Sequence, residues 1–166
     1  QHRARRSGRI VKASAPGKLM LFGEYAVLEG HRALAQCFDR RISCTVERGG
    51  DRLQLLAPGV FEPAIDLPAE VLASGACPDE RLALLWPVLT RHLSGGARLV
   101  FDAGFPPTWG LGSSSASSLA AAAALAGPGV ERFYEVRDAQ RALQGAASGY
   151  DAATQLLGGA VAYRDG

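Results

Sequence analysis

The sequence has few cysteines, and they form no recognisable pattern. Cys37, Cys44 and Cys77 are odd in number and include no Cys-x-x-Cys pair. Neither a disulfide framework nor a zinc site is therefore expected, and the thiols are expected to be reduced. A run of 18 apolar residues is also lacking, and no secretory signal is found. We predict a cytoplasmic protein without a membrane-spanning segment.

A large excess of one charge is missing as well. The 166 residues carry 18 Lys and Arg against 16 Asp and Glu, a net charge of +2. Part of the positive excess lies near the start, and we predict residues 1–8 to be a basic tail. The alternative is an arm that binds nucleic acid or a membrane. A nucleic-acid-binding domain would carry a clustered basic face, so we predict no nucleic-acid or membrane partner.

The periodicity of apolar residues predicts mostly strands in the first half of the chain. A turn is predicted at Pro16-Gly17 and a hairpin loop at 48–51, after which the next strand is expected to pair back. Four prolines predict an irregular surface excursion over 58–78. The predicted strands are 9–15, 19–22 (a second strand or a continuation of the first), 32–36, 40–47, 52–57, 97–101 and 158–163.

Helices are predicted mainly in the second half. Asp79 is placed to cap a helix over 80–92, with a kink at Pro87. Its apolar face is formed by Leu82, Leu85, Trp86 and Leu89. Further helices are predicted from Ser113 or Ser114 onward and over 131–144, and 152–157 is helical or extended. Since strands come first and helices later, we predict an α+β fold rather than regular βαβ units.

One glycine–serine turn opens directly into an alanine-rich helix, in "PPTWGLGSSSASSLAAAAALAG" (106–127). The start of a helix has unpaired N–H groups and a partial positive charge, and glycines let an anion approach the backbone. The serines either cap the helix or help to hold an anion or a metal ion. The dinucleotide-binding fingerprint fails because Ser115 replaces its third glycine. The P-loop pattern fails because no lysine follows.

Two charged residues stand in small-residue surroundings. Lys18 follows "SAPG" and precedes an apolar run, so it either reaches solvent or is held for an anion or carboxylate. Asp151 ends the loop "QGAASGYD" (144–151). It either caps a short helix or acts as a base or as the partner of Lys18.

Three segments, in this order, resemble the GHMP kinase family in its mevalonate/phosphomevalonate kinase branch: "SAPGKLMLFGEYAVLEG", "PPTWGLGSSSASS" and "GAASGYDAATQLLGG". The resemblance implies an α+β, ribosomal protein S5 domain 2-like N-terminal domain over 9–166. It also implies ATP-dependent phosphoryl transfer with Mg²⁺. The C-terminal domain of such kinases is absent from the sequence.

The resemblance also implies the roles of single residues. Asp151 would orient or deprotonate the attacking hydroxyl, and Lys18 would pair with Asp151 and steady the γ-phosphoryl group. Ser114 would help to hold Mg²⁺. Gln140 falls where some mevalonate kinases place a metal-binding glutamate, so the metal would depend more on Ser114 and ATP. The implied phosphate loop contains Pro107, Gly110, Leu111, Gly112, Ser113, Ser114 and Ser115, and the implied acceptor residues are Glu24, Tyr25 and Ser148.

The predicted acceptor is 5-phosphomevalonate, and the prediction depends on a single residue of the first motif. Tyr25 in "GEYAVLEG" favours phosphomevalonate kinases, since mevalonate kinases usually have His there. Arg32, Arg40 and Arg41 are then candidates for the substrate phosphate. The alternatives are a mevalonate kinase, another GHMP small-molecule kinase, and a decarboxylase of a diphosphorylated substrate.

Three other classes of protein fit the sequence less well. A non-catalytic GHMP-like binding module is one, but such a protein would be free to lose Lys18, Ser114 and Asp151. An RNA-binding module would need a basic face with aromatic residues, and a serine hydrolase would need the G-x-S-x-G turn. The C-terminal half of the enzyme or a second copy is the predicted protein partner, because a half-enzyme exposes apolar surface.

Overall fold

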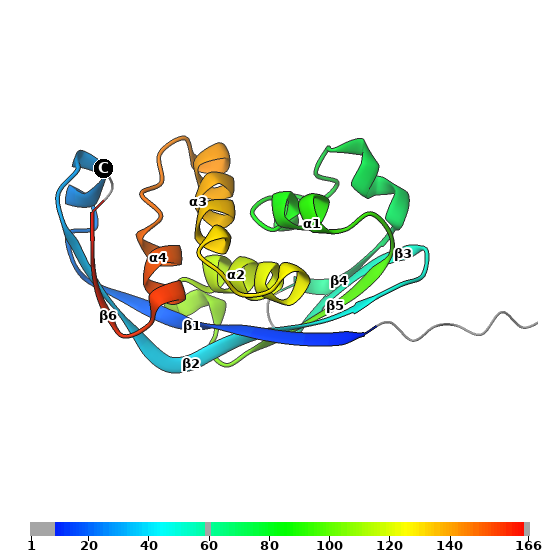
Figure 1. The fold of residues 1–166 in the computed structure, drawn as a ribbon, viewed down its shortest axis with the longest axis horizontal. Helices are drawn as coiled ribbons and strands as arrows, with labels where there is room; N and C mark the ends of the chain where they lie inside the picture. The colour runs from blue at the N-terminus through cyan, green and yellow to red at the C-terminus, as the bar shows by residue number, and fades with distance from the viewer. Residues whose placement is uncertain (1–8, 59–60, 165–166) are drawn as a thin grey trace, which may run out of the picture.

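The computed structural model describes residues 9–58 and 61–164 and shows one mixed sheet with its helices on one face (Figure 1). The predicted basic tail lies outside the described residues. The sheet has the order β1-β2-β5-β3-β4, and β6 also pairs with β2. The strands are β1 (Ile10–Phe22), β2 (Ala33–Arg48), β3 (Arg52–Ala57), β4 (Phe61–Pro68), β5 (Ala97–Ala103) and β6 (Ala160–Tyr163).

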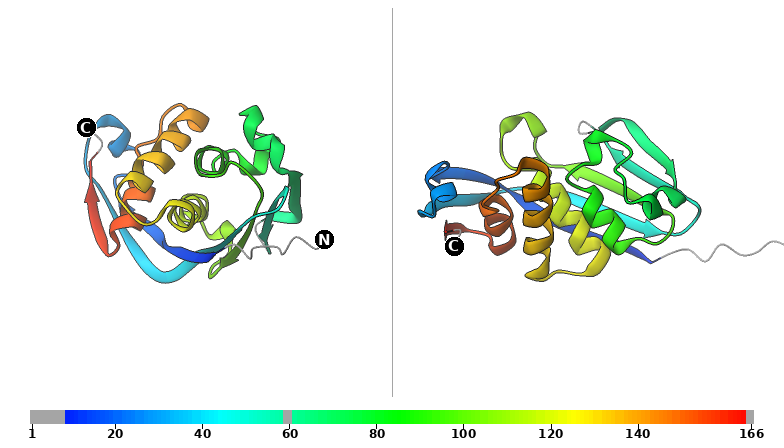
Figure 2. Two further views of the ribbon diagram at one scale, coloured as in Figure 1. Left: turned by 45° about the vertical axis from the view of Figure 1, so that its right-hand side comes forward. Right: turned by 90° about the horizontal axis from the view of Figure 1, so that it is seen from above.

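Four α-helices form the second layer, which Figure 2 shows from an oblique direction and from above. They are α1 (Trp86–His92), α2 (Ser113–Ala126), α3 (Glu131–Gln144) and α4 (Tyr150–Leu157). Short 3₁₀ helices lie at Ala26–Glu29, Ala69–Ser74, Glu80–Leu82 and Pro107–Trp109. The predicted α+β class is confirmed. No helix in the described ranges is long and apolar enough to cross a membrane.

The predicted turn at Pro16-Gly17 is wrong, because β1 continues through it. The pairing with β2 shifts there from Pro16↔Arg41 to Gly17↔Phe38, which is the mark of a β-bulge. A side chain at Gly17 would collide with the Phe38 ring. The glycine therefore lets the strand pass under an aromatic side chain instead of turning. The predicted strands over 32–36 and 40–47 are likewise parts of one strand, β2.

The predicted hairpin between β2 and β3 is also wrong. β5 lies between them, antiparallel to β2 and parallel to β3. Its Leu99 is fully buried between the two neighbours, and this long-range burial outweighs the local turn signal.

The irregular excursion expected over 58–78 contains a strand, β4, which pairs with β3. β4 is the last strand in the order, and an edge strand tolerates prolines that cannot donate a hydrogen bond.

The predicted helix over 80–92 is interrupted. A 3₁₀ turn forms first, with Asp79 accepting a hydrogen bond from the Arg81 N–H at 3.0 Å. α1 then begins at Trp86, with Pro87 in its first turn, where a missing N–H costs nothing. Pro87 therefore starts a helix and does not kink one. The predicted apolar face is confirmed, because Leu82, Leu85, Trp86 and Leu89 are all buried.

α2 is the central helix and packs on β1 and β2. Most of its residues are buried, including Ala120, Ala121 and Ala122, which have no exposed surface. Alanine adds little bulk, so the helix can lie close to the sheet and to the other helices at once. The alanine run thus places the start of α2, with its glycine–serine turn, against the middle of β1.

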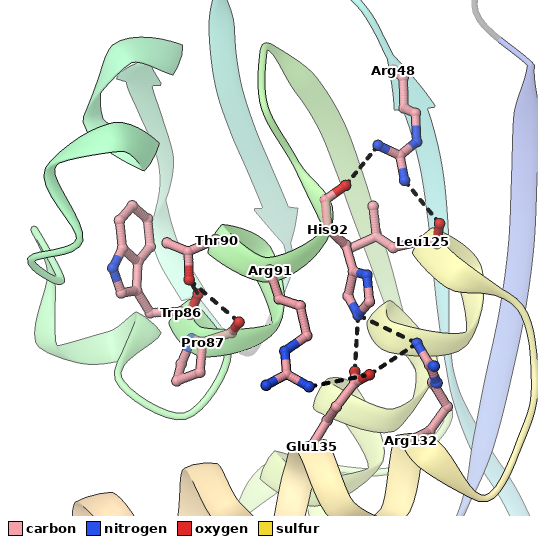
Figure 3. A network of polar contacts seen from close by, with 9 residues as sticks. All are labelled: Arg48, Trp86, Pro87, Thr90, Arg91, His92, Leu125, Arg132 and Glu135. Carbon is pink, nitrogen blue, oxygen red and sulfur yellow. Dashed lines mark hydrogen bonds and ion pairs between the residues drawn. The ribbon is translucent and has the colours of Figure 1, made fainter.

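A polar network connects the outer helices (Figure 3). The buried carboxylate of Glu135 in α3 lies 3.1 Å from Arg132 Nη1 and 2.9 Å from His92 Nε2 at the end of α1. Arg48 donates to the carbonyl groups of His92 and Leu125, each at 2.8 Å. These contacts tie α1, α2 and α3 to β2 at the end of the molecule away from Lys18.

Candidate active site

The glycine–serine turn is fastened to β1 through backbone and side chain. The Lys18 N–H donates to the Leu111 carbonyl at 2.9 Å. Gly112 has a φ of +73°, and a Cβ there would lie 2.9 Å from Lys18 Cε and 2.8 Å from Gln155 Nε2. Only glycine satisfies both the left-handed backbone and this close approach. The lysine stem therefore runs directly along the turn.

The start of α2 has no side-chain cap. Its N-cap residue is Gly112, which has no side chain. Ser114 is exposed and Ser113 half-buried, whereas Ser115 is fully buried. Ser115 Oγ donates to the Gly112 carbonyl at 3.1 Å and to Gln155 Oε1 at 2.7 Å. The first N–H groups of a helix have no intrahelical partner, which suits an anion, and Ser114 is exposed beside them. The Ser115 hydroxyl holds the turn from inside.

Gln155 is a site residue that no sequence motif indicates. Its Nε2 donates to the Gly112 carbonyl at 2.9 Å, and its Oε1 accepts from Ser115. The side chain is almost fully buried. It comes from α4, the helix that begins with Tyr150 and Asp151, so one helix fixes both the turn and the predicted catalytic carboxylate.

Lys18 and Asp151 form an ion pair. Lys18 Nζ lies 2.7 Å from Asp151 Oδ1, and the two side chains are 7% and 25% exposed. The Tyr150 hydroxyl accepts a hydrogen bond from the same ammonium group at 3.1 Å. Burial alone would lower the pKa of Lys18, but the Asp151 carboxylate and the Tyr150 hydroxyl together raise it above its ordinary value. Lys18 is therefore a fixed positive charge between the turn and α4.

A pocket of about 240 Å³ lies beside this pair. It brings together the three predicted acceptor residues, Glu24, Tyr25 and Ser148, with Asp151. Tyr25 is 80% exposed, whereas Ser148 is buried. The remaining lining residues are Leu28, Gln140, Gln144, Ala146, Ala147, Gly149 and Tyr150.

The pocket lining is acidic. Among the described residues that form it, Glu24 and Asp151 are the charged ones, and none is Lys, Arg or His. The three arginines considered for a substrate phosphate lie elsewhere. Arg32 lines a separate cavity of about 160 Å³ with His31 and Arg164. Arg41 donates to the Ser14 hydroxyl at 2.8 Å, and Arg40 is an exposed residue of β2.

Gln140 lines the pocket, and only 7% of the residue is exposed. Its Oε1 has no hydrogen-bond partner among the described residues. A buried carbonyl without a donor is unfavourable, so the site suits a ligand or water that donates one. In the described part of the chain no group of three or more His, Cys, Asp or Glu could hold a metal ion.

Replacing Gln140 with glutamate would add a third carboxylate to the pocket. We expect Gln140→Glu to lower the Mg²⁺ concentration needed for half-maximal activity severalfold, because Mg²⁺ prefers carboxylate oxygens. The same charge would raise the KM of an anionic acceptor. The matched control is Gln144→Glu, which adds the same charge at an exposed residue of the same pocket. Equal Mg²⁺ dependence in the two variants would contradict the prediction.

Comparison with known proteins supports the family resemblance found in the sequence. Residues 81–159 match the family model described as the GHMP kinases N terminal domain. This range contains the glycine–serine turn, α2, α3 and Asp151. The chain is 32% identical over 167 aligned positions to a mevalonate kinase of Aeropyrum pernix, which covers 95% of this chain and 52% of that protein.

Solved structures share the fold. A mevalonate kinase of Methanococcus jannaschii matches with a TM-score of 0.75 at 22% identity, covering 97% of this chain and 55% of that one. A phosphomevalonate kinase of Streptococcus pneumoniae, solved with phosphomevalonate and AMPPNP, matches with a TM-score of 0.72 at 20% identity. It covers 93% of this chain and 50% of that one. The chain thus spans about half the length of these relatives, and its residues 81–159 match the N-terminal domain of the GHMP kinase family.

Proposed function

We propose that this chain supplies the phosphate-binding and acceptor-binding half of a kinase of the isoprenoid pathway. The reaction is transfer of the γ-phosphoryl group of ATP to a hydroxyl of a small molecule. The observation that carries the proposal is the position of the Lys18–Asp151 pair. It lies between a glycine turn suited to phosphates and a pocket suited to a small polar acceptor.

Some of these residues would stabilise phosphate charge, and others would orient the acceptor. Phosphoryl transfer depends mainly on positioning and on stabilising charge. The first-turn N–H groups of α2 would bind phosphate oxygens, and Ser114 would contribute a ligand to Mg²⁺, whose role is to neutralise phosphate charge. Lys18 would steady the transferring group. Asp151 would accept the hydrogen bond of the acceptor hydroxyl and aim its oxygen at the phosphorus.

Two acceptors fit the proposal, each on a different observation. Tyr25, which stands where mevalonate kinases usually have His, favours 5-phosphomevalonate. The pocket lining, with two carboxylates and no cation among its described residues, favours mevalonate, which carries one anionic group instead of two. The identity to a mevalonate kinase supports the second acceptor. We therefore keep both acceptors, and the assay below separates them.

The experiment is an ADP-release assay with Mg·ATP and the complete gene product, offering mevalonate and 5-phosphomevalonate separately. Turnover is expected with one of them, together with a phosphorylated product and no release of CO₂. CO₂ release would indicate the decarboxylase alternative. Nucleotide binding without turnover on either compound would assign the pocket to another alcohol, or to a non-catalytic binding module if no alcohol is phosphorylated. Absence of nucleotide binding would overturn the proposal.

Cytoplasmic location and association with a C-terminal half or a second copy stay predictions. Apolar side chains on the described surface support the second of them. Phe22, Leu157 and Trp109 are 73%, 72% and 62% exposed. Such residues, when they are contiguous, commonly mark protein contacts.

A further inference from the structure

We propose that Tyr150 is a positioning residue for Lys18: its hydroxyl holds the ammonium group in one orientation, so that one N–H stays directed at the transferring phosphoryl group. The inference rests on the proposed function. It adds a residue that neither the sequence motifs nor the comparisons assign. Tyr150 comes immediately before Asp151, and both side chains reach Lys18 from the first turn of α4.

The hydrogen-bonding capacity of the ammonium group is the first step. A lysine ammonium has three donors. One faces Asp151 Oδ1 at 2.7 Å and a second faces the Tyr150 hydroxyl at 3.1 Å. Because these two contacts come from adjacent residues of one helix, they fix the rotation of the group about its last bond. The third N–H is then held in a single direction.

The surroundings of Lys18 are the second step. Its backbone N–H is tied to Leu111, and its stem lies against Gly112 in the phosphate-binding turn. The Nζ atom lies 4.8 Å from the centre of the Tyr150 ring, a cation–π contact that keeps it on that side of the pocket. Asp151 alone would be one contact, about which an ammonium group can rotate. The tyrosine hydroxyl removes this freedom.

The start of α4 is rigid enough to carry this function. Gly149, its N-cap residue, has a φ of +81°, and a Cβ there would lie 2.6 Å from Arg137 Cγ of α3. The carbonyl of the buried Ser148 accepts a hydrogen bond from the Tyr163 hydroxyl at 2.6 Å. The backbone that presents Tyr150 is therefore held from α3 and from β6.

The protonation state of Tyr150 agrees with this geometry. Burial raises the pKa of Tyr150, and the Asp151 charge raises it further, so the phenol is neutral at physiological pH. Its oxygen is then free to accept from Lys18. Asp151 and Tyr150 of α4 are the titratable groups that face Lys18 in the described structure. Cys37, its neighbour in β2, donates its thiol to the Thr154 carbonyl.

The first test reads Lys18 directly. Lys12 and Lys18 are the only lysines of the 166-residue sequence, and Lys12 is exposed. In protein with ¹³C- and ¹⁵N-labelled lysine, Lys12→Arg assigns the two side chains, and Lys12 then serves as the internal reference. We expect Tyr150→Phe, which keeps the ring but removes the acceptor, to move the titration of Lys18 to lower pH. The Lys12 signal should be the same in the variant and the wild type. This measurement needs no acceptor, so it stands even if the proposed reaction fails.

The second test reads catalysis with whichever acceptor is turned over. Tyr150→Phe should lower kcat about tenfold, the effect of losing one hydrogen bond to a charged group, with the KM for ATP unchanged. The alkaline limb of the pH–rate profile should move to lower pH. Tyr134→Phe, at a half-exposed tyrosine of α3, is the control and should change neither. An unchanged Lys18 titration, or a normal kcat and pH profile in Tyr150→Phe, would overturn the proposal.

Discussion

Asp151→Asn is expected to lower kcat about a thousandfold, within the range for loss of a catalytic acid–base group. Asparagine keeps the size of the side chain but loses the charge that attracts Lys18 Nζ at 2.7 Å and the carboxylate oxygens that would orient the acceptor. ATP binding should change much less, because the glycine–serine turn is still held by the hydrogen bond from the Lys18 N–H to the Leu111 carbonyl and by the Gln155 side chain. Steady-state kinetics with the preferred acceptor, beside ATP binding measured by calorimetry, checks both parts.

The same variant should be destabilised, because it leaves a buried ammonium group without its counter-charge. We expect a loss of about 2 kcal/mol in unfolding free energy, less than the ~3–5 kcal/mol of a fully buried pair, since Asp151 is 25% exposed. The pKa of Lys18 is raised above 10.5, so the pair stabilises the fold below that pH and its contribution is lost as the pH rises through the raised pKa. Urea unfolding at neutral pH and above pH 11 measures this.

A surface aspartate provides the control for these experiments. Asp138→Asn removes a charge of α3 whose side chain is 65% exposed and pairs with its neighbour Arg137. The Asp138→Asn variant should leave kcat and unfolding free energy nearly unchanged. If Asp151→Asn retained more than a tenth of the wild-type kcat, Asp151 would not be the residue that orients the acceptor.

Gly112→Ala is the second change with a large expected effect. An alanine would be held at a φ of +73°, and its Cβ would meet Lys18 Cε at 2.9 Å and Gln155 Nε2 at 2.8 Å. The strained backbone alone costs about 1–3 kcal/mol. The displaced lysine and turn should lower kcat/KM for ATP roughly a hundredfold, which is the size of effect that a small misplacement of reacting groups produces.

Gly75→Ala is the control that separates the effect of backbone strain from the effect of displacing Lys18 and the turn. Gly75 has a φ of +70°, and a Cβ there would meet nothing within 4 Å. It lies after the 3₁₀ helix Ala69–Ser74, outside the pocket lining. This variant should lose unfolding free energy through strain while its kinetics for ATP stay normal. If Gly112→Ala and Gly75→Ala behaved alike in both measurements, the contact between Lys18 and the turn would have no role in ATP use.

The helices and the principal site residues could be predicted because their signals are local. The helix over 131–144 has the predicted bounds, and α2 begins at Ser113, one of the two predicted starts. Lys18, Gly112 and Asp151 each stand in a short motif, and the structure brings them together. The pocket also contains Glu24, Tyr25 and Ser148. Their roles stay predictions until the variants are measured.

What could not be predicted depends on contacts between distant segments. No local pattern shows that β5 would separate β2 from β3, because the pairing is decided by burial of Leu99 and its neighbours. Gln155 and Tyr150 were missed for the same reason: a glutamine and a tyrosine in a short helix have no special pattern. Their importance follows from the approach of α4 to β1 and to the start of α2.

The position of β5 also has a consequence for the growing polypeptide on the ribosome. The β1–β2 hairpin can form as soon as residue 48 has left the exit tunnel. The other edge of β2 is paired only by two later strands: β5 (Ala97–Ala103) pairs with its residues 42–48, and β6 (Ala160–Tyr163) pairs with its residues 33–36. An uncovered strand edge is a template for aggregation. We therefore expect the nascent chain to be most sensitive to chaperone depletion between these points of synthesis. Holdases should bind arrested chains whose residues 97–103 are still inside the exit tunnel more strongly than chains in which these residues have emerged.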